Sequence, residues 1–114
     1  MNNIEKAKEL FEDGVNLIQN KKFEQAEEKF LKSLQLIPDR ESVLNNLSSA
    51  QIKLGKYQEA KNSAKRVIEL NLNNAVAWMN LGVIEQELGS FEIALNYFNK
   101  AIEIDPLYFH VYNN

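Results

Sequence analysis

The 114-residue chain offers few side chains that could carry out catalysis. It has one histidine, His110, and no cysteine, so disulfides and thiolate metal sites are excluded and an activated nucleophile has no partner. The adjacent carboxylates Glu27 and Glu28 could act as acid and base, but Lys29 and Lys32 lie nearby, which favours a solvated charged helix face. We therefore expect no active site, no metal and no cofactor.

Amide side chains offer a different chemistry, because Asn46, Asn80 and Asn114 are spaced 34 residues apart. Asparagine carries both a donor and an acceptor, so a row of them can pair with the backbone of an extended peptide. The alternative explanation is compositional, since asparagine is common throughout this chain. The spacing therefore fits a peptide-binding row of asparagines, and it fits the composition of the chain as well.

The same 34-residue interval governs the residues that would pack helices together. Small, aromatic and turn-forming residues each recur at this period: Ala26, Ala60 and Ala94; Phe23, Tyr57 and Phe91; Pro38, Leu72 and Pro106. A fixed period of this size predicts stacked copies of one helical hairpin in place of one globular core. We place the copies at residues 7–40, 41–74 and 75–108.

Apolar residues within each copy are three or four positions apart, which indicates amphipathic helices. Gly55 and Gly89 separate the two halves of the second and third copies, whereas in the first copy Asn20 or Lys21 must adopt a positive φ. Pro38 and Pro106 stop the second helix, and asparagines replace proline in the middle copy. The expected helices span residues 3–19, 23–36, 41–54, 57–70, 75–88 and 91–104.

The third copy makes the resemblance specific. It carries the residues Trp78, Leu81, Gly82, Ala94, Phe98 and Pro106, and the chain thereby resembles the tetratricopeptide-repeat (TPR) family. The first two copies match less closely, and Glu85 replaces a usual aromatic residue. The resemblance implies one all-α domain over residues 1–114, a right-handed α-α superhelix, or solenoid, of antiparallel helix hairpins.

The resemblance also implies that the first helix of each pair lines a concave groove, and that the protein is an interaction scaffold holding an extended peptide or a helix of a partner. The candidate partner-binding residues are Phe11, Val15, Asn45, Asn46, Ser49, Met79, Asn80 and Val83. Some family members clamp the C-terminal carboxylate of heat-shock chaperones with basic residues. Phe11, Val15, Val76 and Asn80 occupy those positions and only Asn46 agrees, so we do not expect that clamp.

The formal net charge of −3, with both signs interspersed, argues against a nucleic-acid partner and gives no reason to expect a membrane surface. The polar amino terminus does not resemble a signal peptide, so a cytoplasmic location is expected. Two other functions remain open. The chain could be the assembly or targeting region of a larger enzyme, such as a glycosyl- or methyltransferase, or it could be a self-association module.

Residues 109–114 resemble the opening of a fourth copy, because Val111-Tyr112-Asn113-Asn114 echoes Val43-Leu44-Asn45-Asn46. We therefore expect the chain to be a segment of a longer protein. The outer face of the last complete hairpin would then expose apolar surface. We expect a second chain to cover it, making a homo-oligomer through the C-terminal end by dimerisation or by exchange of the terminal segment.

Overall fold

The computed structural model describes residues 1–107, and the predicted fourth copy lies outside the described residues. The described part is all helical. Its helices are α1 (Asn3–Gln19), α2 (Phe23–Leu36), α3 (Glu41–Lys53), α4 (Tyr57–Leu70), α5 (Ala75–Glu87) and α6 (Phe91–Ile104). These bounds confirm the predicted helices, except that α3 and α5 each end one residue earlier than expected.

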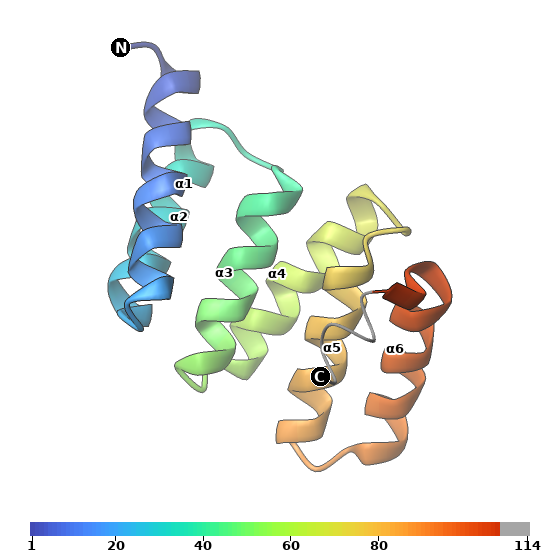
Figure 1. The fold of residues 1–114 in the computed structure, drawn as a ribbon. Coiled ribbons are helices and arrows are strands. Elements are labelled where there is room, and N and C mark those ends of the chain that lie inside the picture. Colours follow the sequence, from blue (N-terminus) through green and yellow to red (C-terminus); the bar gives the residue numbers. More distant parts are fainter. Residues whose placement is uncertain (108–114) are drawn as a thin grey trace.

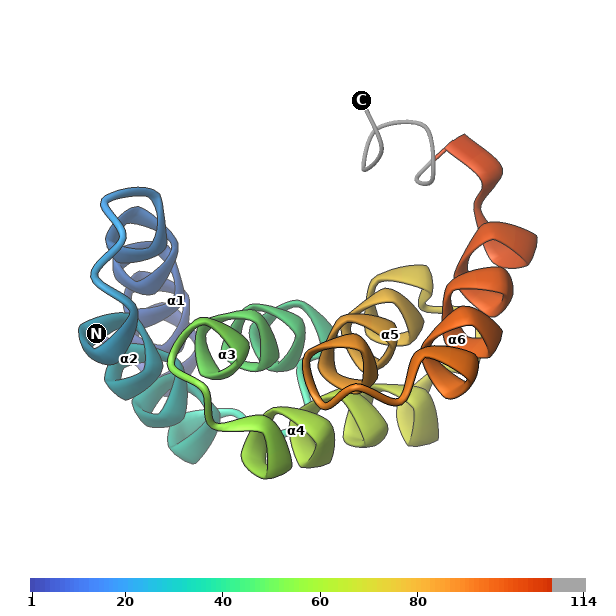
Figure 2. The same ribbon diagram turned by 90° about the horizontal axis from the view of Figure 1, so that it is seen from below.

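The helices pair as three hairpins, α1 with α2, α3 with α4 and α5 with α6, and successive hairpins stack side by side (Figure 1). The molecule is elongated, with extents of 46 × 26 × 25 Å. Figure 2 shows an arc in which α3 and α5 lie on the inner side and α2 and α4 on the outer side. Because α3 contacts both α1 and α5, the first helices of the copies form a continuous inner face.

Close contact within a hairpin depends on a small residue facing a large one. A Cβ atom added to Gly14 would lie 2.4 Å from Phe30 Cε1, and one added to Gly82 would lie 2.4 Å from Phe98 Cε1. Nonbonded carbon atoms do not approach so closely, so these glycines make room for the rings. The middle copy has Ser48 at the glycine position, and both Ser48 and Ala64, at the phenylalanine position, are fully buried.

The turn inside each hairpin has the same hydrogen bonds in all three copies. In the first, the Lys22 amide donates to the Leu17 carbonyl and the Lys21 amide to the Ile18 carbonyl, the pattern that ends a helix with one left-handed residue. Lys21, one of the two residues that the sequence allowed, is that residue, with φ of 60°, and Gly55 and Gly89 take its place in the other copies. Asp39 also has a positive φ, of 62°, which the sequence did not predict.

Asparagines end α4 and begin α5 where the other copies have proline. The Asn71 side chain accepts a hydrogen bond from the Asn73 amide, and the Asn74 side chain caps α5 by accepting one from the Ala77 amide. Both Nδ2 groups donate to Glu41 Oε1 at 3.0 Å. The bonds from Asn74 and Asn71 hold the pKa of the Glu41 carboxyl below its usual value. The connection between α4 and α5 is therefore held by hydrogen bonds to Glu41, the first residue of α3.

Candidate partner-binding groove

The inner face brings the predicted groove residues together from three helices. Phe11 and Val15 come from α1; Asn45, Asn46 and Ser49 from α3; Met79, Asn80 and Val83 from α5. The residues from α1 and α3, together with Val83, are half-buried and can offer surface to a partner. Met79 and Asn80 are only 4% and 7% exposed, so α5 presents much less of these two side chains.

Phe11 is shared between the groove and the core. Its ring centroid lies 6.0 Å from that of Phe30, which is fully buried, and the Arg40 guanidinium carbon lies 5.9 Å from the Phe11 centroid. Arginine placed near an aromatic face is held by the charge distribution of the ring. The apolar surface expected from Phe11 is thus partly covered by a cation at the edge of the inner face.

The amide groups of Asn46 and Asn80 are fixed by hydrogen bonds to backbone carbonyls. Asn46 Nδ2 donates to the Ser42 carbonyl at 2.8 Å, and Asn80 Nδ2 donates to the Asn45 carbonyl at 3.3 Å. Within residues 1–107 neither Oδ1 atom accepts a hydrogen bond. The Oδ1 atoms of the two side chains can therefore accept hydrogen bonds from N–H donors. Asn114, the third asparagine of the predicted row, lies outside the described residues.

Asn45 belongs to a polar cluster that the sequence did not reveal. Its Nδ2 donates to Asn74 Oδ1 at 3.1 Å, and Asn74 in turn binds Glu41. The Oδ1 atom of Asn45 is buried and has no hydrogen-bond partner among the described residues. A buried acceptor left unpaired costs about 1–3 kcal/mol, so this atom lowers the stability of the fold. The only sequence signal for the cluster is the concentration of asparagine at residues 71–74.

The prediction of a solvated Glu27–Glu28 face is wrong for Glu27. Glu28 pairs with Lys32 at 3.1 Å on the surface, as expected. Glu27, however, is only 6% exposed and accepts hydrogen bonds from Lys56 Nζ at 2.7 Å and Gln51 Nε2 at 3.3 Å. The hydrogen bond to Glu27 raises the pKa of the Lys56 ammonium. The local sequence pattern pointed to Lys29 and Lys32 as neighbours of Glu27, whereas its partners, Gln51 and Lys56, belong to the next hairpin.

Glu85 forms the corresponding ion pair where the second and third hairpins meet. Its side chain is 8% exposed and meets Lys61 Nζ at 2.7 Å. The residue that departs from the family pattern thus forms an ion pair between α4 and α5. Both pairs hold neighbouring hairpins together, and neither has the accessible, substrate-facing geometry of a catalytic group.

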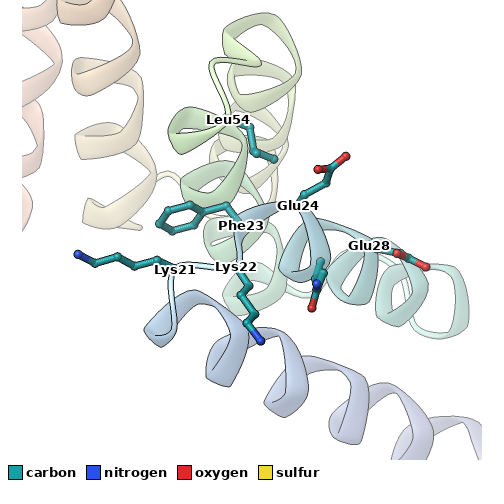
Figure 3. A pocket seen from close by; sticks show the side chains of 7 residues that line it. Lys21, Lys22, Phe23, Glu24, Glu28 and Leu54 are labelled. Carbon is teal, nitrogen blue, oxygen red and sulfur yellow. The ribbon is translucent and has the colours of Figure 1, made fainter.

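A hollow of about 490 Å³ lies at the turn between α1 and α2 (Figure 3). Phe23 and Leu54 give it an apolar part, and charged side chains, including Lys21, Lys22 and Glu28, line the rest. None of the predicted groove residues lines this hollow. Over the described residues there is also no cluster of three or more potential metal ligands and no helix long and apolar enough to cross a bilayer.

Comparisons with known proteins agree with this architecture. Human tetratricopeptide repeat protein 33 is 28% identical over 103 residues, which cover 90% of this chain and 39% of that protein. Human protein O-mannosyl-transferase TMTC3 is 30% identical over 86 residues, covering 75% of this chain and 9% of that protein. This chain therefore spans less than half of the length of either relative.

Among solved structures, the first TPR of Spaghetti (RPAP3) bound to the HSP90 peptide SRMEEVD superposes with a TM-score of 0.83 at 24% identity. The match covers 90% of this chain and 81% of that one, and it confirms the all-α solenoid of helical hairpins. Models of the tetratricopeptide repeat match residues 41–74 and residues 75–108, more than half of the chain. The chain therefore belongs to the tetratricopeptide-repeat family.

Proposed function

We propose that the chain is a protein-interaction scaffold that holds an extended segment of a partner along the inner face formed by α1, α3 and α5. The observation that carries this proposal is the arrangement of Asn46 and Asn80. Each occupies the same position in successive copies, and each keeps its Oδ1 acceptor unpaired within the described residues while Nδ2 is held by a backbone carbonyl. An acceptor already held in place pays less entropy when a ligand binds.

The extended segment would donate its backbone N–H groups to these two oxygens. Asn80 is 7% exposed, so the ligand must approach it closely, whereas the half-buried Asn46 is easier to reach. Val15 and Val83 are half-buried on the same face and would contact apolar side chains of the partner. A single module of this kind binds weakly, with an affinity on the order of micromolar, or about −8 kcal/mol.

The partner chemistry differs from that of an acidic chaperone tail. The RPAP3 domain was solved with the HSP90 peptide SRMEEVD, whose acidic end needs cations in the groove. In this chain Phe11, Val15 and Val76 stand at three of the clamp positions identified from the family resemblance. We therefore expect the groove to prefer an uncharged or apolar extended segment.

The test is a selection from a displayed library of random peptides, followed by affinity measurement for the best binders by calorimetry. The variant Asn46→Ala/Asn80→Ala should weaken binding at least tenfold. Its matched control is Asn62→Ala/Asn99→Ala, because both of those asparagines are exposed on second helices. Unchanged affinity in the groove variant would refute the amide mechanism, and tight binding of SRMEEVD would refute the proposed partner chemistry.

A second function is supported by the match to TMTC3. A relative that is named as a transferase and contains a similar segment favours the assembly or targeting region of a larger enzyme. In that case removal of this region from the larger protein should abolish recruitment of a protein partner and leave turnover of a small acceptor unchanged. The cytoplasmic location expected from the sequence stays a prediction, which a fluorescent fusion of the chain would test.

A further inference from the structure

Arg40, at the edge of the inner face, is a cation without a polar partner in the described part of the chain. The residue is half-buried, and within residues 1–107 its guanidinium makes no hydrogen bond and no ion pair. The guanidinium carbon lies 5.9 Å from the centroid of the Phe11 ring, which holds it in place. Arginine carries five N–H donors, and buried polar groups normally have partners. The donors of Arg40 are therefore open to a ligand.

The two acidic residues beside Arg40 in the sequence are bound to other partners. Asp39 accepts two hydrogen bonds from Arg66, each of 2.8 Å, and Glu41 accepts two from the connection between α4 and α5. Asp39 also has a φ of 62°, a conformation that favours glycine, so the chain accepts strain directly before Arg40. These bonds fix the backbone on both sides of Arg40 and leave its charge uncompensated by either neighbour.

Arg40 also occupies a position where another residue would stabilise the fold better. It is the N-cap of α3, and its side chain makes no capping hydrogen bond. The equivalent residue one copy later is Asn74, which caps α5 by accepting a hydrogen bond from the Ala77 amide. Arginine is a poor N-cap, so α3 begins without the stabilisation that α5 has. Stability given up for a charged side chain beside the groove favours a role in binding.

We propose that Arg40, held by Phe11, is a subsite for an aspartate or glutamate side chain of the bound segment. This inference rests on the function proposed above and adds one carboxylate to its partner chemistry; opposite α3 and α5 the segment stays uncharged. The carboxylate accepts two parallel N–H bonds from the guanidinium. Because the Phe11 ring already holds the guanidinium in place, less side-chain entropy is lost when the carboxylate binds.

The subsite differs from the clamp for a C-terminal carboxylate. Arg40 belongs to the connection before α3, outside the clamp positions, and its guanidinium lies over a ring of α1. The segment proposed above runs along α1 as well as α3 and α5. It therefore passes Arg40 without ending there, and the carboxylate that it brings belongs to a side chain.

The test begins with a displayed library of random peptides selected against the wild type, Arg40→Glu and Lys53→Glu. Peptides bound by the wild type should share an acidic residue at one fixed position. Arg40→Glu should replace this preference with lysine or arginine at the same position. Lys53→Glu is the matched control, because Lys53 is exposed at the other end of α3 and the change in charge is the same. It should keep the acidic residue.

Synthetic peptides then measure the size of the effect. The best wild-type binder is prepared with glutamate or with glutamine at the fixed position, acetylated and amidated at its ends. Calorimetry at low salt should show roughly fivefold tighter binding of the glutamate peptide by the wild type, and high salt should reduce the difference. A third peptide ends at the fixed position with glutamine and a free carboxylate. It should bind more weakly than the glutamate peptide.

The variant Arg40→Asn separates a binding role from a structural one. Asparagine can cap α3 as Asn74 caps α5, so this variant should unfold at the same or a higher urea concentration than the wild type. It should nevertheless bind the glutamate and glutamine peptides equally. A purely structural residue would give the opposite result, with a lower unfolding midpoint and an unchanged preference for glutamate.

Four results would overturn the proposal. The first is that peptides which depend on Asn46 and Asn80 carry no fixed acidic residue. The second is that Lys53→Glu changes the selected residue as Arg40→Glu does. The third is that Arg40→Asn keeps the preference for glutamate. The fourth is that the peptide with the free carboxylate binds as tightly as the glutamate peptide, which would assign the subsite to the end of a chain.

Failure of the subsite can be told apart from failure of the proposed function. Peptides that lose affinity for Asn46→Ala/Asn80→Ala but bind Arg40→Asn as tightly as the wild type would support the groove and refute the subsite. Peptides whose affinity depends on Arg40 but not on the two asparagines would refute the amide mechanism and support the subsite. A selection that yields no binders would refute both.

Discussion

The contact between Gly14 and Phe30 gives a prediction in which packing opposes helix propensity. Glycine to alanine inside a helix normally stabilises it by about 0.8–1 kcal/mol. At Gly14, however, the new Cβ would lie 2.4 Å from Phe30 Cε1 and 2.8 Å from Cδ1 and Cζ. Phe30 is fully buried and has no open space to turn into, so overpacking costs about 1–3 kcal/mol. We expect Gly14→Ala to destabilise the chain by about 1 kcal/mol net.

Urea unfolding followed by far-ultraviolet circular dichroism measures this difference in the free energy of unfolding. The matched background is Phe30→Leu, which shortens the side chain that the new methyl group would meet. In that background Gly14→Ala should stabilise the chain, and the double-mutant cycle should report the coupling. If Gly14→Ala stabilises the wild-type chain by the full helix-propensity gain, then the Phe30 ring is not held in place and the packing argument fails.

Three further predictions concern the connections between copies. Lys61→Met should lower the free energy of unfolding in urea by about 2–3 kcal/mol, because it leaves Glu85 buried without its cation. Adding Glu85→Leu to this variant should recover most of the loss, and additive losses from the two substitutions would contradict the ion-pair argument. The Glu41 pKa is lowered, so its contribution to stability is present above the unfolded-state value of about 4.5 and is lost as the pH falls through the lower folded-state value. Glu41→Gln should therefore lose stability at neutral pH and match the wild type in acid, and a constant difference in unfolding midpoint across this range would count against the hydrogen bonds. Leu72→Pro should raise the midpoint of thermal unfolding, with a gain of about 0.4–1 kcal/mol, because the other copies have proline at this position; a lower midpoint would show that Leu72 has an incompatible backbone.

The sequence predicted the helices almost to the residue because their limits depend on local signals. The 34-residue period aligns each turn with the other two, so Gly55 and Gly89 also locate the turn at Lys21. Pairing across hairpins is not a local property. Glu27 has lysines close in sequence, yet its partners are Gln51 and Lys56 of the next hairpin.

The repeat frame predicted which helices face the groove, but it did not predict how deep each residue lies. Met79 and Asn45 occupy equivalent positions, yet Met79 is buried whereas Asn45 is half-buried. Such differences depend on the side chains that neighbouring helices contribute. The hydrogen bonds that fix Asn46 and Asn80 likewise depend on backbone carbonyls whose direction the spacing of residues does not reveal.

The two junctions of this chain use different pairs, and this constrains how the gene for it can change. Loss of residues 41–74 would place α5 directly on α2, where Glu85 would meet Glu27, two carboxylates that each depend on a lysine removed with the middle unit. A shortened chain should therefore be less stable, and a second mutation at one of these glutamates should recover part of the loss. The middle unit thus supplies both lysines that keep these two glutamates paired.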